Sequence, residues 1–381
     1  MTPKERVAAA FSGGSTDKIP VHHIGLSSQV ASALLGRDAY VGGGIQQWRE
    51  AAALWRGGDA HQEFLERSYQ DAIDVARVLG NDIIRVSYWR YPRKPTRQID
   101  EHTFVFEQGE PRDWEVLRFD PASEECHITS HLPESEPTFE EIEESLAREE
   151  RAIADYSPAA PEFEVRALRE LGEEYAIRCG AAAVGIPLGH ANVWLAAVAL
   201  RPDLVARRLD LQVEYARRTV PFLASLGFRY MFGGGDFASN DGPMYSPTAF
   251  RELVLPRLQQ VSEICHRHGC HHLFASDGNL WPVADDLFGT SGIDGYYEID
   301  RRAGMDLREL HDRFPGLTTI GNISSHTLHL GTKDDVRREV EEAIAEGKRF
   351  GKTVVGVSNY IVPGTPVENV AAMIETVARL R

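Results

Sequence analysis

The chain has 381 residues, of which 43% are hydrophobic and 26% charged, with a formal net charge of -16 at pH 7. This acidic balance disfavours nucleic acid or an anionic membrane as the main partner, and no apolar run approaches the roughly 18 residues of a membrane helix. The four cysteines (Cys126, Cys179, Cys265 and Cys270) form no CxxC pair. Reduced thiols and a cytoplasmic location are therefore expected, and the first residues predict a charged helix rather than a signal peptide.

The predicted elements begin with a helix and a strand. Residues 2–11 predict a short amphipathic helix capped by Thr2, and residues 19–25 predict the first strand. Residues 26–80 are mainly helical, and residues 82–89 form the second predicted strand. Its far end carries cationic and aromatic side chains: Arg85, Tyr88, Trp89 and Arg90.

An insertion of different character occupies about residues 91–160. Residues 102–108 and 114–120 alternate apolar and polar side chains and are joined by Gly109-Glu110-Pro111, which predicts a β-hairpin. Residues 135–156 are strongly acidic and predict a solvated helix, to which we attach no function.

From residue 161 onward, predicted helices and strands alternate. Six further strands are predicted at residues 175–184, 229–232, 271–275, 295–299, 317–320 and 353–357. Helices are predicted at residues 161–172, 191–200, 202–225, 248–268, 280–288, 307–313, 333–350 and 366–380. Eight strands, each with a helix before the next, predict an α/β protein with a single (β/α)8 TIM barrel domain over residues 1–381, whose site lies at the C-terminal ends of the strands. A doubly wound open sheet is the rival, but no GxGxxG follows the first strand.

Polar side chains gather at the predicted strand ends. The run Phe228–Pro247 is the clearest case, because an apolar strand ends in three glycines followed by Asp236 and Asp241. Proton transfer is the chemistry that such acids and imidazoles support, and the candidate catalytic residues are Asp236, Asp277, Glu298 and His190. The candidate substrate-binding residues are His22, Arg85, Tyr88, Trp89, Asp241, Asn322 and Asn359.

Structural explanations compete with these roles. Strand-end Asp and Asn often cap the next helix, which is an equal alternative for Asp241 and Asn322. Glu298 lies within a strand that should be buried, where a carboxylate needs a partner or a function. His22 and His23 cannot both point inward, because neighbours on a strand face opposite sides. The histidines between residues 266 and 272 are expected at the opposite end of the barrel, away from any metal centre.

Five segments carry a resemblance to a known family. They are TPKERVAAAFSGGSTDKIPV, SPTAFRELVLPRLQQVSEICHRHG, FASDGN, TIGNISSHTLHLGTKDDV and IVPGTPVENVAAMIETV, in this order along nearly the whole chain. With them the chain resembles the uroporphyrinogen decarboxylase superfamily, whose fold is a (β/α)8 barrel. Its members include cofactor-independent decarboxylases of uroporphyrinogen and corrinoid-dependent methyltransferases.

The chain departs from both branches at motif positions. The decarboxylases carry an arginine-rich motif after the first strand, whereas residues 22–28 here read HHIGLSS, and Asn359 stands where they carry a histidine. The zinc methyltransferases carry a His-x-Cys pair where this chain has Ala275-Ser276-Asp277, so their thiol-activating zinc site is absent. Asp277 and Glu298 remain the candidate ligands if zinc or another metal is bound.

The resemblance is therefore closest to members that act on methylated small molecules. It implies a methyltransferase or O-demethylase component that moves a methyl group from a small, methoxylated aromatic substrate to a corrinoid protein. Asp277, Asp236, Glu298 or His190 would supply the proton, while Arg85, Tyr88 and Trp89 would orient an aromatic carboxylate. A cofactor-independent decarboxylase and a non-catalytic binding homologue are the alternatives, and a homodimer is the state typical of the family.

Overall fold

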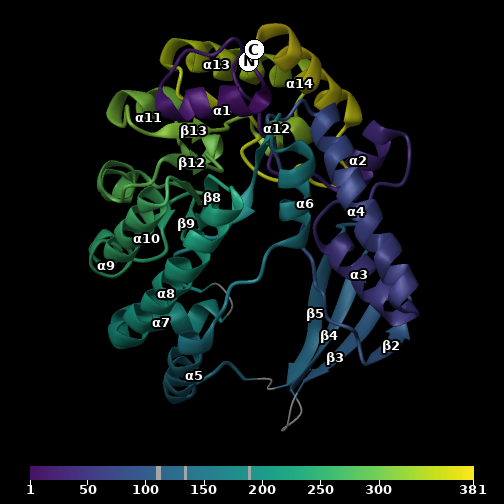
Figure 1. Ribbon diagram of the computed structural model, residues 1–381, viewed down its shortest axis with the longest axis vertical. Coiled ribbons are helices and arrows are strands. Elements are labelled where there is room, and N and C mark those ends of the chain that lie inside the picture. Colours follow the sequence, from purple (N-terminus) through teal and green to yellow (C-terminus); the bar gives the residue numbers. More distant parts are fainter. Residues whose placement is uncertain (109–112, 133–134, 188–189) are drawn as a thin grey trace.

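The computed structural model describes residues 1–108, 113–132, 135–187 and 190–381 and shows a mixed α/β fold (Figure 1). Parallel strands lie at its centre, with helices around them, and the two chain ends meet at one end of the molecule. An antiparallel sheet projects at the other end, below α3.

The parallel strands fall into a larger and a smaller sheet. The larger sheet has six strands in the order β14-β13-β12-β11-β8-β7. Their bounds are β7 Cys179–Gly180, β8 Tyr230–Gly234, β11 His271–Ala275, β12 Gly295–Tyr297, β13 Thr318–Ile320 and β14 Thr353–Val354. The smaller sheet pairs β1 (Ile83–Ile84) with β6 (Ala176–Ile177).

The predicted first strand is present only as isolated pairings. Val21 pairs with Val355, and Leu26 with Ile361, each in the parallel sense. The backbone N–H of His22 donates to the Val355 carbonyl, and that of Asp82 donates to the Val21 carbonyl. Residues 20–22 therefore lie between β14 and the start of β1, although the assigned sheets form no single continuous barrel in the described part of the chain.

Alternate residues of the parallel strands pack on one another, together with two side chains of α1, Val7 and Phe11. The other members of this apolar cluster are Ile24, Ile83, Ala176, Tyr230, Phe232, Leu273, Ala275, Tyr297, Ile320 and Val354. The residues between them, such as Ile84, Met231 and Phe274, belong to the main core beneath the helices. We call the side that carries the first cluster the inner face. Because strand side chains alternate, residues 22, 85 and 178 share the parity of the inner face.

Most helices follow the predicted ranges closely. The predicted helix 280–288 is instead a 3-10 helix, Trp281–Val283, followed by a π-helix, Asp285–Thr290, and the predicted helix 248–268 is divided by a π-helical turn, Phe250–Val254. The α-helices are α1 Pro3–Ser12, α2 Ser28–Leu35, α3 Gly44–Arg56, α4 Gly58–Val78, α5 Phe139–Ala152, α6 Glu162–Leu171, α7 Ala191–Leu200, α8 Pro202–Leu226, α9 Pro247–Ala249, α10 Leu255–Arg267, α11 Leu307–Arg313, α12 Ser325–Leu330, α13 Lys333–Phe350 and α14 Val367–Leu380. Thr2 caps α1 with a capping box, as predicted. The short α12 is not among the predicted elements. No helix in the described ranges combines the length and the apolar character needed to cross a bilayer.

The insertion holds more strands than the predicted hairpin. Its antiparallel sheet has the order β2-β3-β4-β5, with bounds β2 Arg97–Asp100, β3 Thr103–Gln108, β4 Asp113–Asp120 and β5 Glu125–Leu132. The pair β3–β4 is the predicted hairpin, although its turn Gly109-Glu110-Pro111 lies outside the described residues. The hairpin prediction was incomplete because β2 and most of β5 are exposed, so neither shows a buried alternation. The acidic stretch forms α5, as predicted.

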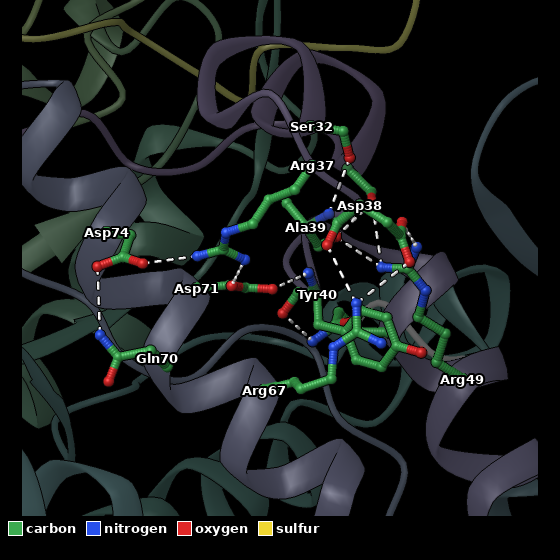
Figure 2. A network of polar contacts seen from close by, with 12 residues as sticks. Ser32, Arg37, Asp38, Ala39, Tyr40, Arg49, Arg67, Gln70, Asp71 and Asp74 are labelled. Atoms are coloured by element: carbon green, nitrogen blue, oxygen red, sulfur yellow. Dashed lines mark hydrogen bonds and ion pairs between the residues drawn. The ribbon is translucent and has the colours of Figure 1, made fainter.

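A polar network fixes the turn between α2 and α3 (Figure 2). The Tyr40 ring lies between two guanidinium groups, with Arg49 at 4.3 Å and Arg67 at 3.7 Å from its centroid. Asp71 of α4 accepts from the Tyr40 backbone N–H at 2.7 Å and pairs with Arg37. These contacts hold the N-terminal helices together beside the inserted sheet.

Asp82 joins both chain ends to the strands. Its buried carboxylate accepts the Val21 N–H at 2.8 Å and pairs with Arg6 of α1 and with the terminal residue Arg381, both at 2.9 Å. This carboxylate therefore supports three separate segments of the chain.

Replacing Asp82 with alanine is expected to lower the free energy of unfolding by roughly 2–4 kcal/mol, because two arginines and a buried N–H lose their partner. Urea unfolding followed by circular dichroism measures the change. The control is Arg379→Ala, which removes a contact to Glu341 at 3.4 Å between two exposed side chains and should cost under about 0.5 kcal/mol. Equal effects of the two variants would contradict this role of Asp82.

Candidate active site

Three carboxylates converge at the C-terminal ends of neighbouring strands. Asp236 follows β8, Asp277 follows β11 and Glu298 follows β12. One oxygen from each lies within 4.8 Å of the other two. The sequence analysis expects these three acids to face one another, and the structure brings them together. Their catalytic role stays a prediction.

Strand register explains why two of these acids meet. Ala275 pairs with Gly234 on one side and with Tyr297 on the other, so these three residues lie at the same level. Asp236 and Asp277 each follow their reference residue by two positions and so share its inner-face parity. At Gly233 a Cβ atom would lie 2.1 Å from the Ala182 carbonyl oxygen, so only glycine allows this approach of the strands.

Glu298 reaches the cluster through an unusual backbone conformation. It follows Tyr297 by one position, and strand alternation alone would turn its side chain toward the helices. Its φ of 70° is in the left-handed region, which non-glycine residues rarely adopt. This conformation redirects the carboxylate toward Asp236 and Asp277. A local strain of order 1–3 kcal/mol at such a position is typical of functional sites.

Burial and mutual repulsion keep protons on the cluster. Burial first, and then the charges of Asp236 and Asp300, raise the pKa of Asp277 to about 7. Burial, followed by Asp277 and Asp236, raises the pKa of Glu298 to about 8. Burial also raises the pKa of Asp236. At neutral pH the cluster therefore holds protons that it can transfer.

Asn359 positions Asp277. Its Nδ2–H donates to Asp277 Oδ2 at 2.7 Å, and its Oδ1 accepts the Tyr360 backbone N–H at 2.5 Å. The second bond fixes which side of the amide faces the carboxylate. The sequence analysis assigns Asn359 to substrate binding, whereas the structure gives it a direct partner in Asp277.

A pocket of about 220 Å³ opens onto Asp277. It is lined by Asn240, Asp277, Asp300, Arg302, Ser324, Ser325, His326, Ser358 and Asn359. A small molecule, or one end of a larger one, can therefore reach the Asp277 carboxyl. His326, from the unpredicted helix α12, is an exposed imidazole that the sequence analysis does not identify. The sequence feature that could have identified His326 is the segment SSHTLHL, which follows the predicted strand at residues 317–320.

The cationic and aromatic residues after β1 lie on the other side of the site. Arg85 donates to the carbonyls of Ser87 and Ile24 at 2.9 and 3.0 Å, and its guanidinium lies 4.7 Å from the Tyr88 ring. Trp89 is 49% exposed and stacks on Tyr360, with 5.7 Å between ring centroids. These residues therefore approach the loop that carries Asn359.

Arg178 is a site residue that the sequence analysis does not identify. It separates β6 from β7, and its guanidinium lies 4.5 Å from the Phe232 ring and 5.5 Å from the Tyr297 ring. Both rings belong to the inner face. The available signal is an arginine within a predicted buried strand, where a charge requires an explanation.

His22 is buried as a neutral side chain. Its Nδ1–H donates to the Ile83 carbonyl at 3.0 Å, which leaves Nε2 as an acceptor. Nε2 is buried and has no hydrogen-bond partner in the described part of the chain. Burial, followed by the charge of Arg178, holds the pKa of His22 well below its usual range. His23 is also buried, and its Nδ1 accepts the Val357 N–H at 3.2 Å, which is a structural contact.

Three predicted residues lie in other surroundings. His190 is exposed at the start of α7 and lines a pocket of about 350 Å³ with residues of α5 and α8. Asp241 is exposed, and its backbone N–H donates to Ser239 Oγ at 3.2 Å, which is a turn contact. Asn322 is buried and lines a different pocket, with Arg308 and Glu346. The structure therefore places His190 in a different pocket from the one that holds Asp277, and its catalytic role stays a prediction; Leu188 and Gly189, which precede it, lie outside the described residues.

The carboxylate cluster, and not the histidines, has the donors of a metal site. Its three oxygens are hard ligands of the kind that suit Mg²⁺, Mn²⁺ or Ca²⁺. A soft thiolate site is unsupported, since burial raises the pKa of Cys179 and Cys265 to about 12. His272 is used in hydrogen bonds to Ser262 and Ala182, as expected for a structural histidine.

Comparison with known proteins finds a match to one protein family and a solved structure with a similar fold. Residues 235–380 match the family model for uroporphyrinogen decarboxylase (URO-D). A uroporphyrinogen decarboxylase from Anaeromyxobacter sp. (strain Fw109-5) is 30% identical over 130 residues, which is 33% of this chain and only 35% of that protein. A solved methyltransferase from Methanosarcina mazei superposes with a TM-score of 0.65 at 19% identity, over 100% of this chain and 99% of the other. At this identity the likeness shows the fold alone.

The raised pKa of Glu298 predicts a dependence of stability on pH. Its pKa rises on folding from 4.5 to about 8, so its contribution to stability is complete below pH 4.5 and is lost as the pH rises to about 8. Glutamine does not ionise. Glu298→Gln should therefore gain roughly 1–3 kcal/mol relative to the wild type between pH 4.5 and 8.5.

Urea unfolding at a series of pH values measures this trend. The matched control is Glu375→Gln, since Glu375 is exposed on α14 and its carboxylate is solvated in both states. A constant difference between Glu298→Gln and the wild type across this range would show that burial does not hold the proton on Glu298.

Proposed function

Because the chain belongs to the uroporphyrinogen decarboxylase superfamily, we propose that it is an enzyme that transfers a methyl group from a small methoxylated substrate to a corrinoid protein. We also propose that its parallel strands close into a (β/α)8 barrel. Closure is supported by the backbone bonds of residues 20–22 to β14 and to Asp82, and by the bond from the Arg178 N–H to the Ile84 carbonyl. The whole-chain likeness to a solved methyltransferase agrees with this fold.

One observation carries the proposed reaction. Burial and nearby charges raise the pKa of the Asp277 carboxyl to about 7, and this carboxyl opens onto a pocket and lies beside two further acids whose pKa values are also raised. Removal of a methyl group from an ether requires a proton for the oxygen that is left behind. A carboxylic acid that keeps its proton near neutral pH is suited to this step.

The residues divide the work as follows. As the carbon–oxygen bond breaks, its electron pair stays on the substrate oxygen, and the Asp277 proton moves to that oxygen. Asn359 holds the Asp277 carboxyl in place, while burial first, and then the charges of Asp236 and Asp300, favour its protonated form. Arg85, Tyr88 and Trp89 orient the substrate. The corrinoid of a partner protein would supply the nucleophile that receives the methyl group.

A bound divalent cation would change these roles. Asp236, Asp277 and Glu298 would then be ionised ligands, and Asp277 would have no proton to give. The three oxygen donors favour a hard cation over zinc, which has no thiolate partner here. Metal analysis of the purified protein separates the two arrangements.

Decarboxylation is the second candidate, favoured by the likeness of residues 235–380 to a decarboxylase. The same acid would serve it. The bond from carbon to the carboxylate breaks, carbon dioxide leaves, and the Asp277 proton is delivered to the carbon. The two candidates differ in the bond that is broken and therefore in the product.

The test combines the purified protein with reduced cobalamin and methoxylated benzoates. Methyl transfer is followed by the change in cobalt absorbance and by chromatography of the demethylated phenol. Asp277→Asn should lower the rate by roughly 10²–10⁴-fold, because asparagine cannot donate the proton. The control is Asp334→Asn, an exposed aspartate in the first turn of α13, which should keep the full rate.

Full methyl transfer by a folded Asp277→Asn variant would contradict the role of Asp277. Carbon dioxide release from a carboxylated compound, without methyl transfer from any ether, would favour the decarboxylase.

A further inference from the structure

Two arginines lie at the inner face without a carboxylate partner. Arg178 contacts the rings of Phe232 and Tyr297, and its buried Nη1 finds no hydrogen-bond partner in the described part of the chain. Arg85 directs its described hydrogen bonds to two backbone carbonyls. Within the described ranges, neither arginine takes part in an ion pair.

The two guanidinium groups are close enough to repel each other. After burial, Arg178 is the next cause that lowers the pKa of Arg85, which falls to about 10. Both arginines also act on Glu298, where they oppose the rise of its pKa. Glu298 is therefore within electrostatic reach of both the arginine pair and the two aspartates.

The titratable neighbours of this pair are neutral at pH 7. His22 holds no proton on Nε2, and burial raises the pKa values of Tyr88 and Tyr297. Glu298, on which both arginines act, forms no ion pair with either of them in the described part of the chain. The pair therefore carries positive charge that no described side chain cancels. A partly buried charge without a partner, with the buried Nη1 of Arg178 unsatisfied, indicates a ligand of opposite charge.

The surroundings indicate the shape of that ligand. Aromatic rings flank both guanidinium groups: Phe232 and Tyr297 beside Arg178, and Tyr88 beside Arg85. Guanidinium groups bind carboxylates in a planar, two-point arrangement, and aromatic rings favour a flat ligand body. The His22 ring also contacts the Phe232 ring, and its buried Nε2 offers an acceptor for a ligand hydroxyl.

We propose that Arg178, with Arg85 beside it, binds the carboxylate of the substrate, and that the substrate is a flat, aromatic carboxylic acid. This proposal rests on the proposed function in taking the inner face as part of the substrate site. The carboxylate lies at the arginine pair, and the reacting group of the same molecule extends past Glu298 toward Asp277.

The experiment measures binding without turnover. Isothermal titration calorimetry compares 4-methoxybenzoate with 4-methoxybenzamide, which has the same shape and no charge. The wild type should bind the carboxylate at least about tenfold more tightly than the amide. Arg178→Met should remove this preference while leaving the affinity for the amide unchanged, and Arg178→Lys should keep part of it. The control Arg169→Met, at a side chain that is 77% exposed, should behave as the wild type.

Thermal unfolding distinguishes a ligand contact from a structural one. Without ligand, Arg178→Met should unfold at the wild-type temperature or above it, since an unpaired buried charge is removed. A strongly lowered midpoint, an unchanged carboxylate preference in the folded variant, or no binding of the carboxylate by the wild type would each overturn the proposal. A preference that depends on Arg178, in a protein that transfers no methyl group, supports this proposal and contradicts only the proposed reaction.

Discussion

The cost of burying charge at the inner face is the constraint on which this site depends. Burial raises the pKa values of Asp277 and Glu298 because it disfavours the carboxylate form, while Arg85 and Arg178 lie nearby without an ion-pair partner in the described part of the chain. In the described structure the acids and the arginines form no ion pairs with one another. Had they paired, the acids would be ionised and unable to give a proton, and the arginines would be neutralised and unable to bind an anion. Their separation is what both proposed roles require.

The scaffold maintains this separation through backbone geometry. Register places Gly234, Ala275 and Tyr297 at one level, so Asp236 and Asp277 emerge together two residues later. Glu298 joins them only because its φ of 70° turns it from the side that alternation would give it. A change at Gly233 would disturb all three, since its lack of a side chain allows the close contact with the carbonyl of Ala182. The positions of the three acids therefore depend on the conformation of the main chain.

The sequence predicted the order of the elements better than their pairing. Buried runs such as residues 271–275 have a clear apolar pattern, and that strand has the predicted bounds. The first strand is reduced to isolated pairings, and β2 and β5 were missed, because exposed or short segments carry no pattern of burial.

In the site, the acids were predictable because polar residues directly follow apolar strands. Arg178 was missed because it lies within a strand. The partner of Asn359 could not be predicted because a contact across 82 positions of the chain depends on how the loops fold. The pocket of His190 could not be predicted for the same reason, since it is lined by residues of α5 and α8 that are distant in sequence.

The two parts of the site come from different parts of the chain. Asp236, Asp277, Glu298 and Asn359 all lie within residues 235–380, the range that matches the family model. His22, Arg85 and Arg178 precede that range, as does the inserted sheet. A buried acid can protonate an oxygen or a carbon, so the shared part does not by itself determine which bond breaks. That choice depends on which group of the substrate is placed at Asp277, and hence on what the arginines and aromatic rings of the first half hold in position. On the proposed function, residues outside the family match therefore decide which reaction takes place at the matched residues.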